Sequence, residues 1–502
     1  MVRLLGTSMT LMLCVALVAA AGCSSSKSST PPQPNSQRAR QRPTGPQADL
    51  SEEITGGNGP FMGSAATTNL PASGYVENEY VASGTASSYR ANGPLTPNGR
   101  WTFTPDSRAE YRTRVLVRRP AHPNAFNGTV IVEWLNVSGG IDADPEWASL
   151  YEEILRRGYA WVGVSAQMIG VMGGPVAVSV PGTGTDVVGK GLKAIDPARY
   201  SSLEHPGDAF SFDIYSQVAR AIGSGAAMGG LRPQRILAAG ESQSAFALVT
   251  YYNGVQPLAT AFDGFFVHSR SASAMPLVPP GKFVDVASGI SGTPTIFRTD
   301  QGAPVLDIQT ETDVGSVLNS YAARQPDTDR FRLWEVAGTA HADAHLVGSL
   351  GQSLNCGAPI NNGPMHVVAK SALRALNTWV QTGRAPVVAP RIDVAPGQHP
   401  QIVRNADGIA LGGIRTPPVD VPVATLSGQP GPNASIICLL LGSTLPFSAA
   451  RLAQLYPSRA GYLQHYNADA DAAIRAGFVL PADRAALLAF AEPARVPVAG
   501  SA

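Results

Sequence analysis

The sequence lacks the clusters of basic residues with which proteins bind nucleic acids. Lysine and arginine number 37 and aspartate and glutamate 36, so the formal net charge of the 502 residues is only +1. No run rich in lysine and arginine stands out along the chain. Because neither a global field nor a basic patch would attract phosphate groups, nucleic acid is not an expected partner.

Cysteine is also scarce, with four in the whole chain. The four form no CxxC pair and no cluster with histidine, so no zinc site is expected, and no other metal or cofactor is predicted. Two of them lie within the first 23 residues, which leaves Cys356 and Cys438. In an oxidising compartment these two are expected to form a disulfide that ties the C-terminal part of the chain to the rest, the alternative being two buried free thiols.

The apolar run near the N-terminus, residues 11–18, is too short to cross a bilayer. Arg3 precedes this run, and the small residues 19–22 and Cys23 follow it, as in an export signal. Residues 19–23 resemble a bacterial lipobox, which implies a signal peptide over residues 1–22 and a lipid on the Cys23 sulfur. We therefore expect an exported lipoprotein anchored in the membrane and facing outside the cytoplasm. The alternative is an ordinary secretory signal in which Cys23 is accidental.

Composition and periodicity divide the rest of the chain into three parts. Residues 23–58 are rich in serine, proline, glutamine and glycine and are expected to be a disordered tether. Residues 59–395 are the expected core, in which 283–302 could be part of a lid, and 396–502 are an expected extension packed on that core. Strands are predicted in the core at 111–117, 129–134, 159–164, 235–239, 262–267, 304–309 and 331–336. Helices are predicted at 146–157, 212–222, from 245 onward and at 371–382, and in the extension at 448–455 and 468–476. This alternation indicates an α/β fold with a mostly parallel central sheet covered by helices.

The segment Gly240-Glu241-Ser242-Gln243-Ser244 lies between a predicted strand and a predicted helix. A nucleophilic serine is presented on a tight turn from strand to helix, where the residues two before and two after it must be small. Gly240 and Ser244 are both small, so Ser242 is the predicted nucleophile. The alternative is an ordinary turn in which a serine caps the helix.

A candidate acid and a candidate base follow Ser242 in the sequence. Glu311 and Asp313 come after the strand at 304–309, and His341 comes after the strand at 331–336. A serine hydroxyl needs such a pair, because it barely ionises near neutral pH without a histidine that a carboxylate orients. Asp313 fits the loop spacing best and Glu311 would reach further, so both remain candidates. His345 is the alternative base, and either histidine could instead be a surface or capping residue.

Two backbone N–H groups are needed to stabilise the oxyanion that forms during acyl transfer. One is expected from Gln243, the residue after the nucleophile. The other is expected from the glycine-rich loop at 135–140, at the amide of Asn136 or Val137. The alternative for this loop is a plain turn.

Taken together, these motifs resemble those of a bacterial family of α/β-hydrolase domain-containing proteins and lipoproteins. The matching stretches are residues 132–138, 200–208, 240–244, 309–313 and 337–343, with later matches at 412–415 and at Cys438. The resemblance covers the chain from about residue 60 to its end. It implies an α/β-hydrolase fold and a Ser-His-acid triad, but it supplies no substrate.

We therefore expect a serine hydrolase, carboxylesterase-like, that cleaves a small-molecule ester through an acyl-enzyme. The alternative is a catalytically silent envelope lipoprotein with a hydrolase fold that binds a ligand or a partner. The sequence specifies neither the acyl and alcohol parts of a substrate nor the oligomeric state.

Overall fold

The computed structural model describes residues 44–63, 68–179, 187–315, 317–395, 401–432 and 436–497. The expected signal peptide, Cys23 and the tether up to residue 43 lie outside these residues. All the described residues belong to one compact unit, Arg42–Ala502. None of the described helices has the length and the apolar character needed to cross a bilayer.

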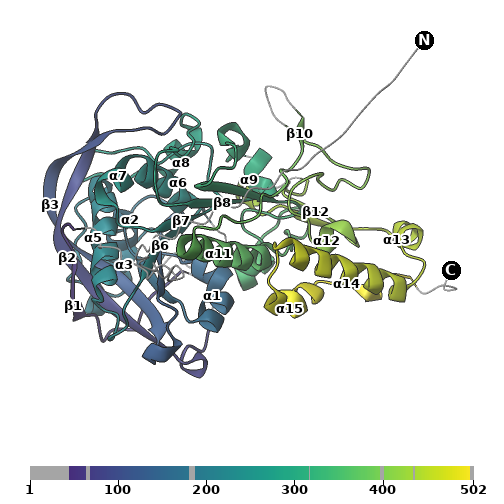
Figure 1. Ribbon diagram of the computed structural model, residues 1–502, viewed down its shortest axis with the longest axis horizontal. Coiled ribbons are helices and arrows are strands. Elements are labelled where there is room, and N and C mark those ends of the chain that lie inside the picture. The colour runs from purple at the N-terminus through teal and green to yellow at the C-terminus, as the bar shows by residue number, and fades with distance from the viewer. Residues whose placement is uncertain are drawn as a thin grey trace, which may run out of the picture. The chain divides into compact units, whose positions relative to one another are not determined.

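Nine strands form one sheet in the order β1-β2-β3-β5-β4-β6-β7-β8-β9 (Figure 1). The strands are β1 Asp49–Glu53, β2 Tyr75–Ala91, β3 Phe103–Pro120, β4 Thr129–Trp134, β5 Ala160–Val164, β6 Arg235–Glu241, β7 Gly264–His268, β8 Val305–Thr310 and β9 Phe331–Val336. The pairs from β1 to β5 along this order are antiparallel, and those from β5 to β9 are parallel. The predicted mostly parallel α/β sheet is confirmed. Two small antiparallel pairs accompany it, β10 Val394–Ala395 with β11 Gln401–Ile402, and β12 Ala424–Ser427 with β13 Ser443–Pro446.

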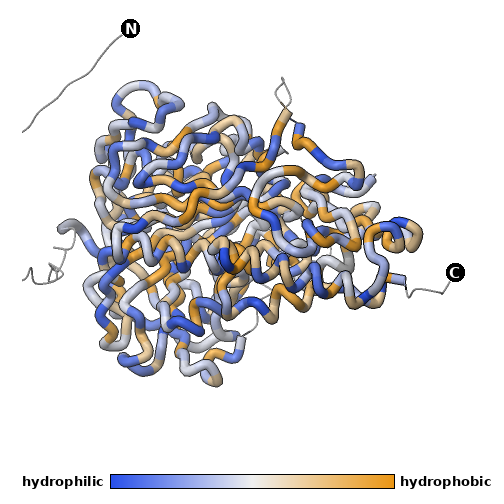
Figure 2. The backbone as a smooth tube through the Cα atoms, turned by 45° about the vertical axis from the view of Figure 1, so that its right-hand side comes forward, coloured by the Kyte–Doolittle hydropathy of each residue, from blue (hydrophilic) through white to orange (hydrophobic). Residues whose placement is uncertain are grey.

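Helices cover both faces of the sheet. The α-helices are α1 Pro145–Arg157, α2 Met168–Met172, α3 Gly191–Ile195, α4 Pro197–Tyr200, α5 Ser211–Ser224, α6 Gln243–Thr250, α7 Gln256–Ala259, α8 Val286–Ser291, α9 Glu311–Gly315, α10 Ala344–Val347, α11 Met365–Thr382, α12 Pro417–Asp420, α13 Ala449–Leu455, α14 Arg459–Ala476 and α15 Arg484–Leu488. Val130 and Val132 of β4 pack in one apolar cluster with α5 and α6, whereas Ile131 packs in another with α1 and α11. Because successive strand residues point to opposite faces, β4 is apolar throughout and buried on both sides. Figure 2 shows such apolar stretches running through the middle of the folded unit.

The structure corrects several boundaries expected from the sequence. The tether was expected to reach residue 58, but β1 pairs with β2 and the side chain of Leu50 is buried. Strand β2 was not predicted, because its half-exposed face gives it a polar sequence. Helix α11 begins at Met365, six residues before the expected start, and the unpredicted helices α2, α3 and α4 lie between the predicted strand at 159–164 and the predicted helix at 212–222.

The C-terminal segment packs on the core through a disulfide, ion pairs and apolar contacts. The expected Cys356–Cys438 disulfide is present, with a Cα–Cα distance of 5.5 Å. Asp483 lies 3.2 Å from the Lys370 ammonium on α11 and 3.0 Å from the Arg156 guanidinium on α1. Val367 of α11 is buried among residues of α14 and α15.

The order of the strands fixes where a site can form. Strands β5 and β6 lie on opposite sides of β4, so the direction of the chain across the sheet reverses at β4. In open parallel sheets such a reversal leaves a crevice at the carboxyl ends of the strands. The loop after β4 and Ser242 after β6 meet at this position.

Candidate active site

Ser242 lies on a tight turn between β6 and α6. Its backbone angles are φ 59° and ψ −123°, an unusual conformation for a residue with a side chain. Such a conformation costs of order 1–3 kcal/mol and persists only where the surroundings enforce it. A Cβ atom added to Gly240 would lie 3.0 Å from the Cβ of Ser244, so the turn closes only because both residues are small.

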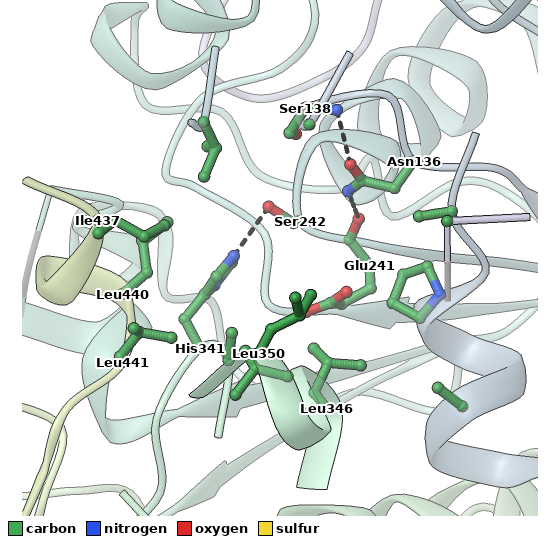
Figure 3. Close-up of a pocket in the computed structure, with 18 of the residues that line it drawn as sticks. Asn136, Ser138, Glu241, Ser242, His341, Leu346, Leu350, Ile437, Leu440 and Leu441 are labelled. Carbon is green, nitrogen blue, oxygen red and sulfur yellow. Dashed lines mark hydrogen bonds between the residues drawn. The ribbon is translucent and has the colours of Figure 1, made fainter. Parts of the chain in front are cut away.

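His341 and Asp313 complete a chain of hydrogen bonds with Ser242. The His341 Nε2 atom lies 2.8 Å from the Ser242 Oγ atom (Figure 3), and its Nδ1 atom lies 2.7 Å from the Asp313 Oδ1 atom. Asp313 lies on α9, directly after β8, and His341 follows β9. Since the carboxyl ends of parallel strands meet at one edge, residues distant in sequence come together there.

The pKa shifts of Asp313 and His341 agree with this arrangement. Burial would raise the pKa of the Asp313 carboxyl, but the charge and hydrogen bond of His341 outweigh it, and the pKa lies below its usual value. Burial would lower the pKa of His341, but the Asp313 carboxylate outweighs it, and the pKa is raised. The site therefore favours a carboxylate beside an imidazolium, the state that arises when a histidine takes a proton from a serine.

Glu311, the other candidate acid, has different partners. Its Oε2 atom accepts the Gly338 N–H at 2.8 Å, and its Oε1 atom accepts the Gly428 N–H at 2.9 Å and lies 2.6 Å from Arg404. Glu311 thus joins the loop before His341 to the C-terminal extension. The structure places Asp313, not Glu311, against the imidazole.

His345, the alternative base, lies away from the nucleophile. Its Nε2 atom is 3.1 Å from the carbonyl oxygen of Ala148, and its ring stacks on His366 with a centroid distance of 3.7 Å. It is His341 that the structure brings to Ser242.

Both expected oxyanion donors in the loop after β4 have an acceptor in the structure. The Asn136 N–H donates to the Ala143 carbonyl at 2.9 Å, and the Val137 N–H donates to Gln243 Oε1 at 3.3 Å, so both amides are engaged. The Asn136 side chain instead accepts the Ser138 N–H at 2.8 Å and donates to the Glu241 carbonyl at 3.0 Å (Figure 3). The loop is thereby fastened to the turn that carries Ser242. Gln243 begins α6, where the first N–H groups have no acceptor within the helix.

A cavity of about 210 Å³ opens at Ser242 and His341. Its polar residues include Asn136, Ser138, Asp144 and Glu241. Its apolar residues include Val178, Leu346, Val347, Leu350, Leu354, Ile437, Leu440 and Leu441. Among the described residues that line this cavity none comes from 283–302, the segment considered as part of a lid.

Glu241 is a site residue that the sequence did not single out. It precedes the nucleophile, is 4% exposed and lines the cavity. Burial raises the pKa of its carboxyl to about 7, although the nearby His341 and His268 oppose the shift. A carboxylate at the end of a buried strand, next to a candidate nucleophile, was the signal that could have identified it.

Within the described part of the chain, no three or more histidine, cysteine, aspartate or glutamate residues are grouped so as to hold a metal ion.

Residues 44–489 match the family model described as "Alpha/beta hydrolase domain". A comparison with curated proteins gives no match. Similar solved structures include a putative dienelactone hydrolase from Klebsiella pneumoniae, at 13% identity and a TM-score of 0.29, covering 60% of this chain and 99% of that one. An esterase from Rhizomucor miehei has 9% identity, a TM-score of 0.30 and coverages of 62% and 85%. A serine hydrolase without a lid from Xanthomonas campestris has 13% identity, a TM-score of 0.28 and coverages of 58% and 94%.

Proposed function

The chain belongs to the alpha/beta hydrolase domain family, and we propose that it is a serine hydrolase that cleaves carboxylic esters. One observation carries the proposal. Ser242, His341 and Asp313 form a continuous chain of hydrogen bonds, 2.8 and 2.7 Å long, at the mouth of a cavity. A hydroxyl, an imidazole and a buried carboxylate in this order are what nucleophilic attack on an acyl carbon requires.

The proposed reaction has two halves. The Ser242 Oγ atom attacks the ester carbonyl carbon while His341 Nε2 takes the hydroxyl proton, and Asp313 holds the Nδ1 proton and stabilises the imidazolium. The Gln243 N–H, at the start of α6, stabilises the oxyanion. His341 then gives its proton to the departing alcohol oxygen, which leaves an acyl-enzyme. Water, deprotonated by His341, attacks the acyl carbon, the acid departs and Ser242 recovers its proton.

A fluorophosphonate probe, which modifies activated serines, tests this proposal directly. The unmodified protein should be labelled and should hydrolyse a short-chain p-nitrophenyl ester, whereas Ser242→Ala should do neither. Ser291→Ala, at an exposed serine on α8, is the matched control and should keep both properties. Equal labelling of the protein and of Ser242→Ala would refute the nucleophile. Absence of labelling and of turnover in all three would leave a ligand-binding protein as the better interpretation.

The proposal also includes a cellular location. We propose that the protein is exported and that a lipid on Cys23 holds it to the membrane. This location is supported by the apolar run at 11–18, the small residues after it and Cys23. A disulfide is in keeping with an oxidising compartment. Cells fed an alkyne fatty acid should incorporate it into the full chain but not into Cys23→Ala. A Cys23→Ala protein that is still labelled and still found with membranes would contradict the lipid anchor.

A further inference from the structure

The wall of the cavity beside His341 is almost entirely aliphatic. Two segments supply most of it, the stretch from α10 through the 3-10 helix Gly348–Ser353 to Leu354, and the stretch from the 3-10 helix Ile436–Leu440 to Leu441. Figure 3 shows Ile437, Leu440 and Leu441 together on one side of His341. Leu346 and Leu350 come from the other segment and face the same space. A surface of this kind removes water from an apolar ligand and offers it nothing to hydrogen-bond.

The Cys356–Cys438 disulfide joins these two segments. Cys356 follows Leu354 by two residues, Cys438 follows Ile437 directly, and both cysteines are buried. The disulfide packs in one cluster with residues that line the cavity, among them Val347 and Leu440. In addition, the Ala342 N–H, next to His341, donates to the Leu440 carbonyl at 3.0 Å. The wall is therefore fixed to itself by a covalent bond and to the catalytic loop by a hydrogen bond.

The charged groups of the cavity give little attraction to a strongly charged substrate chain. Among the described residues that line it there is neither lysine nor arginine, so no cation is at hand for an anionic group. The Asp144 carboxylate lies 2.6 Å from Arg118 and is already paired. Glu241 is buried, and desolvation disfavours its charged form.

We propose that this aliphatic wall binds an apolar carbon chain of the ester, and that the Cys356–Cys438 disulfide holds the wall in position for it. The substrate class is then an ester with a chain of several carbons, on the acyl side or the alcohol side. This inference rests on the proposed esterase function and specifies its substrate.

Two series of esters test the proposed substrate class and show whether the wall binds the acyl chain or the alcohol chain. p-Nitrophenyl esters from acetate to octanoate vary the acyl chain, and alkyl acetates from ethyl to octyl vary the alcohol. kcat/KM should rise along one series by up to about fourfold for each methylene group that is fully buried. A rise in the first series assigns the wall to the acyl chain, and a rise in the second assigns it to the alcohol. A kcat/KM that falls with length in both series overturns the inference.

Substitutions in the aliphatic wall test whether the apolar chain of the substrate binds there. Leu350→Gln and Leu440→Gln place an amide in the wall and should lower the ratio of octyl-chain to short-chain kcat/KM at least tenfold. Leu445→Gln is the matched control, because Leu445 is 44% exposed on β13 and does not line the cavity. The control should keep the ratio of the unmodified protein. An equal ratio in all three variants would show that the chain binds elsewhere.

The disulfide is tested with Cys356→Ser combined with Cys438→Ser, and independently with reductant on the unmodified protein. Circular dichroism first establishes that each sample is folded at the assay temperature, and if the double variant is unfolded the reduced protein replaces it. The chain-length ratio should fall in both samples, while fluorophosphonate still labels Ser242. An unchanged ratio in folded, reduced protein would refute the role of the disulfide. If the labelling of Ser242 and the short-ester activity are absent from the start, the esterase proposal itself has failed, a result distinct from a wrong substrate class.

Discussion

At the scale of single residues, the site depends on two small residues beside Ser242 and on three ionisable side chains, which are Asp313, His341 and Glu311. Gly240 and Ser244 allow the turn that holds Ser242 at φ 59°. Asp313 orients His341 from one side, while Glu311 fixes the loop before it. Two carboxylates two positions apart in sequence therefore have different tasks, which the following substitutions separate.

Asp313→Asn should lower kcat by about 10⁴-fold with little change in stability, because an amide favours the wrong imidazole tautomer. Glu311→Gln should instead lower the free energy of unfolding by about 1–3 kcal/mol, because it weakens a buried acceptor of two backbone N–H groups and of Arg404. Turnover of a short-chain ester and urea unfolding of both variants measure these effects. The assignment is wrong if Glu311→Gln loses as much kcat as Asp313→Asn at unchanged stability.

Glu241→Gln should move the acid limb of the pH profile of kcat/KM to lower pH. Where the Glu241 carboxyl is ionised, near and above its pKa of about 7, it helps to raise the pKa of His341, and only neutral His341 can act as the base. Removing the negative charge makes the imidazolium less stable, so the pKa of His341 falls and the base is available at lower pH. Glu110→Gln, at an exposed position on β3, is the control and should leave the profile in place. A limb that stays in place or moves to higher pH in Glu241→Gln would show that this carboxylate does not act on His341.

At the scale of elements, the antiparallel edge of the sheet differs most from what the sequence indicates. Strands β4 to β9 are short and apolar and read clearly as buried parallel strands. Strands β1 and β2 lie at the edge, where one face is exposed, and their polar residues resemble loop or tether. Leu50 and Ile54 are nevertheless buried, so this part of the expected tether belongs to the fold.

Two truncated chains test where the folded unit begins. A chain that starts at residue 44 should unfold at the same urea concentration as one that starts at residue 24. A chain that starts at residue 59 loses β1 with Leu50 and Ile54, and its free energy of unfolding should be lower by about 2–4 kcal/mol. Identical unfolding of all three chains would show that β1 adds nothing to stability.

At the scale of the whole described unit, the C-terminal extension is bound to the core on two sides. The disulfide packs with residues that line the cavity, whereas α14 and α15 pack against α11 (Figure 1). The extension has an apolar cluster of its own, to which Leu452 of α13 and Tyr462 and Tyr466 of α14 belong. Its helices α14 and α15 share a second cluster with Val367 of the core, and such packing of apolar faces is what stabilises short helices. The extension therefore contributes both to stability and to the cavity wall.

Removal of the disulfide should destabilise the whole unit. The bridge spans 82 residues, and the loop-entropy description gives such a bridge about 4–5 kcal/mol as an upper value. Urea unfolding with and without reductant, and of Cys356→Ala combined with Cys438→Ala, measures the loss. Midpoints that coincide in all samples would mean that the folded contacts alone hold the extension.

The sequence by itself determined the α/β class, the Ser242 turn and the pair of cysteines. Each of these is local or compositional: strand runs that alternate with helices, small residues around one serine, and two cysteines left once the N-terminal pair is set aside. The order of serine, acid and histidine along the chain also predicted that these three residue types would meet, because parallel strands bring their carboxyl ends to one edge.

Only the tertiary structure decided which carboxylate faces His341, which amides are already engaged and what lines the cavity. Asp313 and Glu311 lie two positions apart, and a short helix turns them toward different partners, which spacing alone does not reveal. The Asn136 and Val137 amides form bonds to Ala143 and Gln243 that depend on how the loop folds back. The aliphatic wall combines segments about 80 positions apart, and burial of Glu241 changes the pKa of a carboxyl that looks ordinary in sequence. These are properties of side-chain direction and desolvation, which arise only when the chain has closed around the site.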